Sequence, residues 1–310
     1  AFSGPGMSVV SVIETLRHAE DDNKVKAIFV RLPEGGMPPA AADELRLAFK
    51  AFRATGKTIY AHSQGLYPSG VVTSTYMLGA ATDQFWMQPA SPFQVTGLAT
   101  EDVFFKRFFD KYGITADYEQ RYEFKNAVNP YLQSDYTEAH KSSQLSWMGS
   151  VYRTGIATAA LDRKQTAQGL MQTLEAGPYM AEDAKRLHLV DQLGQVRDVE
   201  TALKAKAGKN AELVDFEAYM RTQNGRESGS GPVIAVIEAE GAIVTGHDGS
   251  GNPFAGGSTI YSDDLSEAIY EAVDDKSVKA IVLRVNSPGG SDTASEQILS
   301  AIKAARAAKK

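Results

Sequence analysis

The stretch Asp21-Asp-Asn-Lys-Val-Lys-Ala-Ile-Phe-Val-Arg31 returns later in the chain as Asp274-Asp-Lys-Ser-Val-Lys-Ala-Ile-Val-Leu-Arg284. A second stretch, Phe49-Lys-Ala-Phe-Arg-Ala54, returns in the same way as Ile302-Lys-Ala-Ala-Arg-Ala307. Both pairs are 253 residues apart, from 21 to 274 and from 49 to 302, and chance similarity would not keep this spacing. The sequence therefore predicts that one domain is duplicated within the chain.

Each copy has the pattern of a helix, a strand and a second helix. Val9–Leu16 and Leu265–Val273 carry apolar residues at helical spacing, and an Asp-Asp turn follows each of them. The apolar run Ile28–Val30 or Ile281–Leu283 comes next, and a glycine turn then leads into another helical pattern. Strands that are apolar on both faces are typical of a sheet covered by helices. The alternation therefore predicts an α/β fold with a largely parallel sheet.

The duplication and the composition divide the chain into three parts. We expect a first domain over residues 1–220, a polar and glycine-rich linker over 221–231, and the start of a second domain over 232–310. The second copy has an extra strand, Val233–Ile237, that the first copy lacks. We therefore expect the first domain to lack its first strand. We expect the second domain to be truncated, since Lys310 is the counterpart of Lys57.

The composition excludes several classes of function. The 310 residues carry a net charge of −6, with 32 Lys and Arg against 38 Asp and Glu, so we expect no nucleic-acid partner. The absence of cysteine excludes disulfides, thiol catalysis and cysteine-ligated zinc. We expect no metal site and no cofactor, because the five histidines lack metal-binding spacing: His18, His62, His140, His188 and His247.

A glycine turn after the strand of the second copy is a candidate binding site. It consists of Ser287, Pro288, Gly289 and Gly290, and a predicted helix follows it. Because neither glycine has a Cβ, their backbone N–H groups could bind an oxyanion or a peptide carbonyl. The alternative is a tight turn between strand and helix that needs positive φ angles and nothing more. The glycines alone leave both interpretations open.

Two motifs resemble those of a known family. The run Val278-Lys-Ala-Ile-Val-Leu-Arg-Val-Asn-Ser-Pro-Gly-Gly290, with the Ser, Ala, Ser and Glu that follow, is similar to the signature of the signal peptide peptidase A family of serine proteases. Gly177–Gly194 is similar to a second motif of that family and departs from it at Met180 and His188, where the family usually has Thr and Gly. The duplicated chain resembles the long, two-domain members of Gram-negative bacteria. The resemblance implies tandem Clp-protease/crotonase-like α/β domains, the second of them incomplete.

The resemblance also implies catalysis by a serine–lysine dyad. In long members the lysine lies in the first domain, and Arg121–Tyr131 matches the element that carries it, which implies Lys125 as the general base. The glycine turn is then implied to contact the oxyanion and the substrate, through Ser287, Pro288, Gly289 and Gly290. The alternative is that Lys125 is an ordinary surface lysine. Four neighbours are of a type that would desolvate an ammonium and favour the neutral amine: Tyr122, Phe124, Ala127 and Val128.

The nucleophilic serine is not expected within these residues. In the family it follows the segment at which the second copy stops, so the resemblance implies a nucleophile after Lys310. In the first copy, Ser69-Gly70 is a tempting candidate, but counting back from Ala80-Ala-Thr-Asp83 brings the family position near Thr73. Long members have typically lost the serine of the first domain. We therefore interpret Ser69 as a loop residue.

The function implied by the resemblance is serine endoproteolysis of cleaved signal peptides and other short apolar peptides. It further implies a homo-oligomer, with a tetramer as one option, and a location at the bacterial inner membrane, facing the periplasm. Membrane association would then depend on a segment absent from this chain. Two alternatives remain open. One is an acyl-CoA hydratase or isomerase of the same fold, and the other is a catalytically inert scaffold or fragment.

Overall fold

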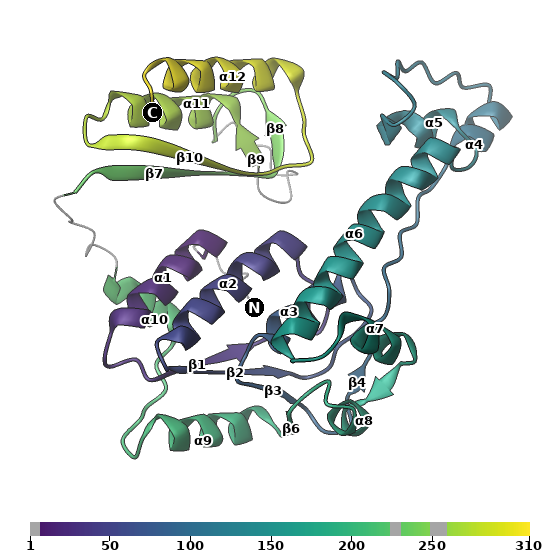
Figure 1. Ribbon diagram of the computed structural model, residues 1–310. Helices are drawn as coiled ribbons and strands as arrows, with labels where there is room; N and C mark the ends of the chain where they lie inside the picture. The colour runs from purple at the N-terminus through teal and green to yellow at the C-terminus, as the bar shows by residue number, and fades with distance from the viewer. Residues whose placement is uncertain (1–6, 224–230, 249–258) are drawn as a thin grey trace. The chain divides into compact units, whose positions relative to one another are not determined.

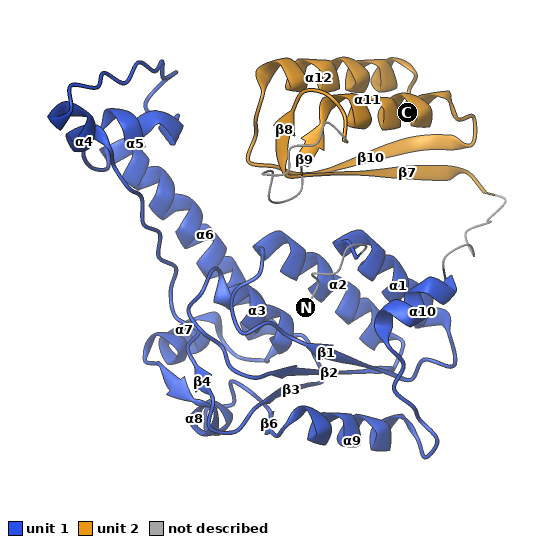
Figure 2. Cartoon of the chain, turned by 180° about the vertical axis from the view of Figure 1, so that it is seen from behind, with its two compact units in different colours: residues 1–224 blue, residues 225–310 orange. Residues whose placement is uncertain are grey.

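The computed structural model describes residues 7–223, 231–248 and 259–310. These residues form two compact units, residues 1–224 and residues 225–310 (Figure 2).

The first unit is built on a parallel sheet of four strands. The strands are β1 (Ala27–Arg31), β2 (Thr58–Ser63), β3 (Gln84–Met87) and β6 (Gln192–Leu193), and they lie in the order β1-β2-β3-β6. The prediction of a largely parallel α/β sheet is therefore confirmed in this unit. One face of this sheet is covered by α1 (Val9–Asp21), α2 (Pro39–Ala54) and α3 (Val72–Ala80), and α9 (Val196–Ala207) lies on the other face (Figure 1).

A long helix, α6 (Glu138–Asp162), joins this sheet layer to a projecting part of the unit. Its C-terminal half is buried at Gly155, Ile156, Ala159 and Ala160, whereas its N-terminal half extends away from the sheet (Figure 1). Two short helices lie at the far end, α4 (Lys106–Lys111) and α5 (Asn129–Leu132). The remaining elements of the unit are η1 (Asn126–Val128), α7 (Ala167–Glu175), β4 (Pro92–Phe93), β5 (Tyr179–Met180), α8 (Ala181–Arg186) and α10 (Phe216–Gln223).

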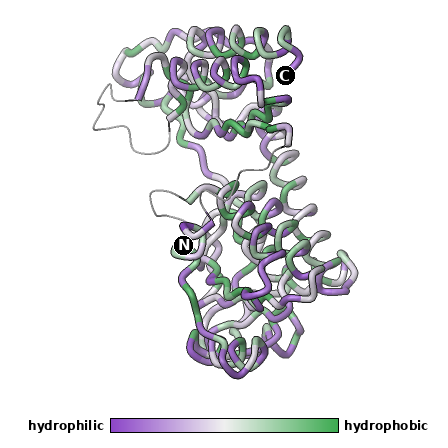
Figure 3. Tube along the Cα trace, turned by 90° about the vertical axis from the view of Figure 1, so that its left-hand side faces the viewer, coloured by the Kyte–Doolittle hydropathy of each residue, from purple (hydrophilic) through white to green (hydrophobic). Residues whose placement is uncertain are grey.

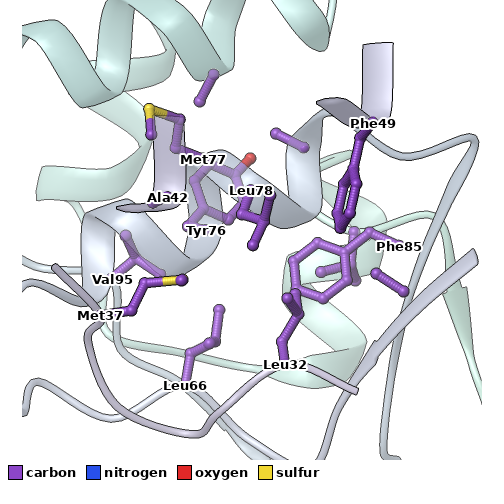
Figure 4. Close-up of a cluster of buried hydrophobic side chains, with 14 of the residues drawn as sticks. Leu32, Met37, Ala42, Phe49, Leu66, Tyr76, Met77, Leu78, Phe85 and Val95 are labelled. Atoms are coloured by element: carbon purple, nitrogen blue, oxygen red, sulfur yellow. The ribbon is translucent and has the colours of Figure 1, made fainter. Parts of the chain in front are cut away.

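The main hydrophobic core lies between the sheet and the helices α2 and α3 (Figure 4). Every residue of α3 is buried, and its Tyr76 ring packs edge-on against Phe93 at 5.5 Å between ring centroids. The absence of a side chain at Gly79 lets the Phe85 ring pack against the helix, since a Cβ at this position would lie 2.8 Å from the ring. Burying each such side chain stabilises the fold by roughly 1.5–3 kcal/mol. A smaller cluster under α9 covers the other face, with Tyr60, Val199 and Leu203.

The second unit is smaller. Its strands β7 (Val233–Glu240) and β10 (Val278–Asn286) form a parallel pair, and β8 (Ala242–Val244) pairs with β9 (Thr259–Tyr261). Two helices pack on them, α11 (Ser262–Asp274) and α12 (Asp292–Ala307). The strands are strongly apolar, while the helices alternate apolar with hydrophilic residues, as an amphipathic layer requires (Figure 3). Their shared core contains Ile260, Leu265, Ile269 and Ile298, among others.

The secondary structure repeats at the offset found in the sequence. Helices α1 and α11 have the same bounds 253 residues apart, and so do α2 and α12. The repeat extends to side chains. Lys57 Nζ donates to the carbonyls of residues 19, 20 and 22 at 2.5–2.9 Å, and Lys310 Nζ donates to those of residues 272, 273 and 275 at 2.5–3.2 Å. Each ammonium therefore caps the C-terminal end of a helix, α1 for Lys57 and α11 for Lys310.

The structure places part of the expected linker within a helix. Residues 221–223, which the composition assigns to the linker, form the last turn of α10. The apolar face of that helix explains this, because Tyr219 packs against the core of the first unit and its hydroxyl donates to Asp22 at 3.1 Å. Residues 224–230 lie outside the described part of the chain.

The two departures from the family motif both fall at the ends of α8. Met180 is the N-cap of this helix, with an extended backbone (φ −90°, ψ 161°), and its side chain makes no capping hydrogen bond. His188 follows the helix with a φ of +56°, in the left-handed region that favours glycine. The Thr and Gly usual in the family would therefore suit these two backbone positions better than the residues present.

Restoring the family residues should stabilise the protein. Met180→Thr would supply a side-chain acceptor for the first turn of α8, which is worth about 1 kcal/mol. His188→Gly removes left-handed strain of roughly 1–2 kcal/mol and loses part of that gain, about 0.4–1 kcal/mol, to the freer unfolded chain. Urea denaturation should show a higher midpoint for each variant. Met180→Ala is the control, because it removes the same side chain without adding a cap. An equal gain from the control would contradict the capping argument.

Candidate active site

The glycine turn of the second unit begins where β10 ends and leads into α12, whose N-cap is Ser291. Gly289 has a φ of +104°, so a residue with a Cβ would be strained there. At Gly290 a Cβ would lie 2.0 Å from the carbonyl oxygen of Ile243 in β8. The β8 backbone contacts the turn on both sides of this position, since Ile243 N donates to Gly289 O at 3.0 Å and Ser291 N donates to Ile243 O at 2.8 Å. The positive φ therefore accounts for Gly289, and close packing accounts for Gly290.

The two glycine N–H groups differ in availability. The N–H of Gly289 donates to Ser287 Oγ at 3.0 Å within the turn itself. The N–H of Gly290 has no hydrogen-bond acceptor among residues 7–223, 231–248 and 259–310, and the residue is exposed. The turn thus offers one backbone donor that an oxygen atom of a ligand could accept from.

The corresponding turn of the first unit is closed. It contains Glu34, Gly35 and Gly36, and the following segment of the chain covers it. Gly36 N donates to Ser69 O at 2.5 Å, and Tyr67 N donates to Glu34 O at 2.7 Å. A Cβ on Gly36 would lie 2.1 Å from Val71 N. The N–H of Gly36 is therefore used within the protein, as is the N–H of its counterpart at the offset of 253, Gly289. The sequence predicts a glycine turn here, and the contact with the segment around Ser69 is visible only in the structure.

Ser69 and Thr73 have different surroundings, and neither arrangement suits a nucleophile. Ser69 is an exposed loop residue whose carbonyl holds the Gly36 turn, as its interpretation as a loop residue requires. Thr73 lies in α3 and is only 1% exposed, with its methyl group packed beside Gly155 of α6. A substrate cannot reach a hydroxyl in that position.

Lys125 is exposed, so the apolar pocket expected around it is not found within the first unit. It is the N-cap of η1, in the segment that connects α4 to α5. Gln120 holds the backbone there, because its Nε2 donates to Lys125 O at 2.9 Å and to Asn129 Oδ1 at 3.2 Å. The expected burial fails because the apolar neighbours Tyr122 and Phe124 are themselves 74% and 59% exposed.

The described residues show no alternative centre for metal or histidine chemistry. No group of three or more His, Asp or Glu side chains could hold a metal ion in residues 7–223, 231–248 and 259–310. His62 is 1% exposed in β2, and its Nε2 lies 3.0 Å from the carbonyl oxygen of Gly194. Burial lowers the pKa of His62, so it stays neutral at pH 7 and serves the packing of the sheet.

A family model described as peptidase family S49 matches residues 51–210, which is half of the chain. The chain belongs to peptidase family S49. The prediction from the sequence, a family of serine peptidases related to signal peptide peptidase A, is therefore confirmed. The matched range includes Lys125 and Thr73, and the glycine turn of the second unit lies outside it.

Curated relatives extend the similarity along the chain. The protein named Protease 4 of Salmonella typhi is 31% identical over 98% of this chain and 49% of its own length. Protease 4 of Haemophilus influenzae is 31% identical over 94% of this chain and 48% of its own length. The chloroplastic serine protease SPPA of Arabidopsis thaliana is 23% identical over 96% of this chain and 44% of its own length. The chain thus spans about half the length of the curated relatives it matches.

Within residues 7–223, 231–248 and 259–310, no helix combines the length and the apolar character needed to cross a bilayer.

Proposed function

We propose that this chain forms part of a serine endopeptidase that degrades cleaved signal peptides and other short apolar peptides with a serine–lysine dyad. The observation that supports the proposal most directly is the open N–H of Gly290, in an exposed turn between a strand and a helix. Membership of peptidase family S49 supports peptide hydrolysis. The two units would be tandem Clp-protease/crotonase-like domains, as the repeated bounds of their helices suggest.

In the proposed mechanism Lys125 accepts the proton of the serine hydroxyl while the serine oxygen attacks the peptide carbonyl. The carbonyl oxygen becomes an oxyanion, which accepts a hydrogen bond from the N–H of Gly290. Ser287 and Pro288 shape the turn, and Ser287 Oγ fixes it by accepting from Gly289 N. The serine itself would come from the nucleophile element that the family pattern expects after Lys310. The protonated lysine then gives its proton to the leaving amine.

Lys125 needs an environment that favours the neutral amine. Because it is exposed in the first unit, the proposal requires that further protein surface covers it in the active assembly. A homo-oligomer, such as a tetramer, is the arrangement that the family resemblance implies. We propose a location at the periplasmic side of the bacterial inner membrane on the basis of the same family resemblance.

An assay of two substrate classes tests the proposed function. A form of the protein that carries the nucleophile element should cleave a quenched fluorescent apolar peptide and should leave an enoyl-CoA thioester unchanged. A hydratase or isomerase would give the opposite result, since it uses the glycine turn on a thioester carbonyl. An inert scaffold would turn over neither substrate. Peptide cleavage that survives all serine-directed inhibitors would also contradict the proposal.

A further inference from the structure

A groove of about 600 Å³ lies on the projecting half of α6, beside the segment that carries Lys125. Phe124 forms one wall, and Trp147 and Val151 contribute apolar surface from the helix. The other lining residues are four serines of α6: Ser142, Ser143, Ser146 and Ser150. The volume lies within the range of roughly 300–1,000 Å³ that is typical of ligand pockets.

The serines are spaced so that their side chains share one surface of the helix. Ser142, Ser146 and Ser150 follow one another at intervals of four residues, and all three are exposed. None of the four hydroxyls has a hydrogen-bond partner among residues 7–223, 231–248 and 259–310. Hydroxyls elsewhere in the chain commonly donate to the carbonyl four residues earlier, as three helical residues do: Thr15, Thr173 and Thr201. The serines of the groove therefore keep their donors and acceptors free.

Two large aromatic side chains face this hydroxyl surface and are left unpacked. Phe124 is 59% exposed, and Trp147 is 47% exposed. The indole is held in place, since Trp147 Nε1 donates to Gln144 Oε1 at 2.5 Å. An ordered aromatic ring exposed to solvent beside free hydroxyls is typical of a surface that contacts a ligand.

The groove lining is uncharged, because it consists of serine, valine, phenylalanine and tryptophan side chains only. A charged ligand would lose hydration without gaining an ionic partner, whereas an uncharged one would not. Free hydroxyls can pair with backbone N–H and C=O groups, which an extended peptide presents along its length. The aromatic rings and Val151 match apolar side chains. An extended, uncharged, apolar peptide segment fits both halves of this surface.

We propose that the groove between Phe124 and Trp147 binds such a segment of the substrate, next to the lysine that acts on it. The inference rests on the proposed function, because the link to catalysis is that Phe124 directly precedes Lys125 in the chain. The serine hydroxyls pair with the peptide backbone, and the two rings hold its apolar side chains. Preference for apolar substrates then has a defined structural origin in the first unit.

Tryptophan fluorescence of the 310-residue chain tests the groove without any hydrolysis. The chain contains two tryptophans, so Trp86→Phe leaves Trp147 as the single reporter. Titration with a blocked, uncharged, leucine-rich decapeptide without aromatic residues should give a saturable blue shift. Phe124→Ala and Ser146→Leu, which remove a wall and fill the groove, should each weaken binding about tenfold or more. Both positions are exposed, and circular dichroism checks that the fold is retained.

The matched control is Leu145→Ala, because Leu145 is 61% exposed on the same helix and does not line the groove. It should bind the peptide as the parent does. The proposal would be overturned by the absence of a saturable shift, by an equal loss in the control, or by equal binding of a decapeptide rich in lysine and glutamate. A shift that appears on raising the protein concentration without peptide would assign the groove to a second copy and also overturn it.

The fluorescence titration and the hydrolysis assay distinguish failure of the groove proposal from failure of the proposed function. If the shift is absent while hydrolysis by the form with the nucleophile element depends on Lys125, the groove inference alone is wrong. If peptide binds in the groove and no hydrolysis depends on Lys125, the proposed function alone is wrong.

Discussion

Lys125→Ala should reduce peptide hydrolysis by roughly 10²–10⁴-fold, the contribution typical of a general base, in a form of the protein that carries the nucleophile element. The loss should appear in kcat, because the amine acts on the serine proton and does not hold the peptide. Lys125→Arg should be equally inactive, since a guanidinium does not give up its proton in proteins. Stopped-flow hydrolysis of an apolar fluorogenic peptide measures both variants.

Lys111→Ala is the matched control for this test. Lys111 is also an exposed lysine of the projecting part of the first unit, at the end of α4, and the proposed mechanism does not use it. Ser69→Ala should likewise leave hydrolysis unchanged, because only the backbone carbonyl of Ser69 is used in holding the Gly36 turn. Activity that survives Lys125→Ala, or that is lost in Ser69→Ala, would refute the assignment of the base and favour a dyad within the first unit.

Gly290→Ala should damage both the second unit and its chemistry. The added Cβ would lie 2.0 Å from the carbonyl oxygen of Ile243, so the backbone of β8 or of the turn has to move. Overpacking of this kind costs roughly 1–3 kcal/mol of stability. The movement would also displace the free N–H, and loss of one oxyanion donor lowers kcat by about 10²–10³-fold. Thermal denaturation and hydrolysis rates measure the two effects separately.

Substitutions at two other glycines of the second unit serve as comparisons for the stability loss of Gly290→Ala. Gly231→Ala should be neutral, because a Cβ there meets no atom within 4 Å and the backbone has no positive φ. Gly289→Ala meets no atom either, but its φ of +104° makes the new residue strained, so an intermediate loss of stability is expected. If Gly290→Ala folds normally and keeps full activity, the open N–H does not bind the oxyanion.

The sequence by itself determined the repeated framework of the fold. The offset of 253 residues predicted paired helices and strands, and α1 with α11 and α2 with α12 have matching bounds. These elements could be predicted because they follow from local periodicity and from a register that similar sequences share. The family assignment had the same basis, since it rests on short motifs of neighbouring residues.

The sequence also pointed to Lys125 and the glycine turn, but it could not give their surroundings. Exposure of Lys125 depends on where the projecting half of α6 carries its segment, which no local pattern records. The turn at Gly35 and Gly36 is a second example. The segment around Ser69 that holds it lies more than thirty residues further on, so no local pattern records the contact.

Tertiary structure decided the remaining features because they depend on contacts between residues distant in the chain. Lys57 closes the end of α1 through carbonyls 35–38 residues away, and a serine surface of α6 meets Phe124 to form a groove. The left-handed backbone at His188 is likewise a property of the folded turn, although the usual glycine of the family hinted at it. Local sequence specifies which elements form, and the packing of those elements determines which donors, hydroxyls and rings stay available for chemistry.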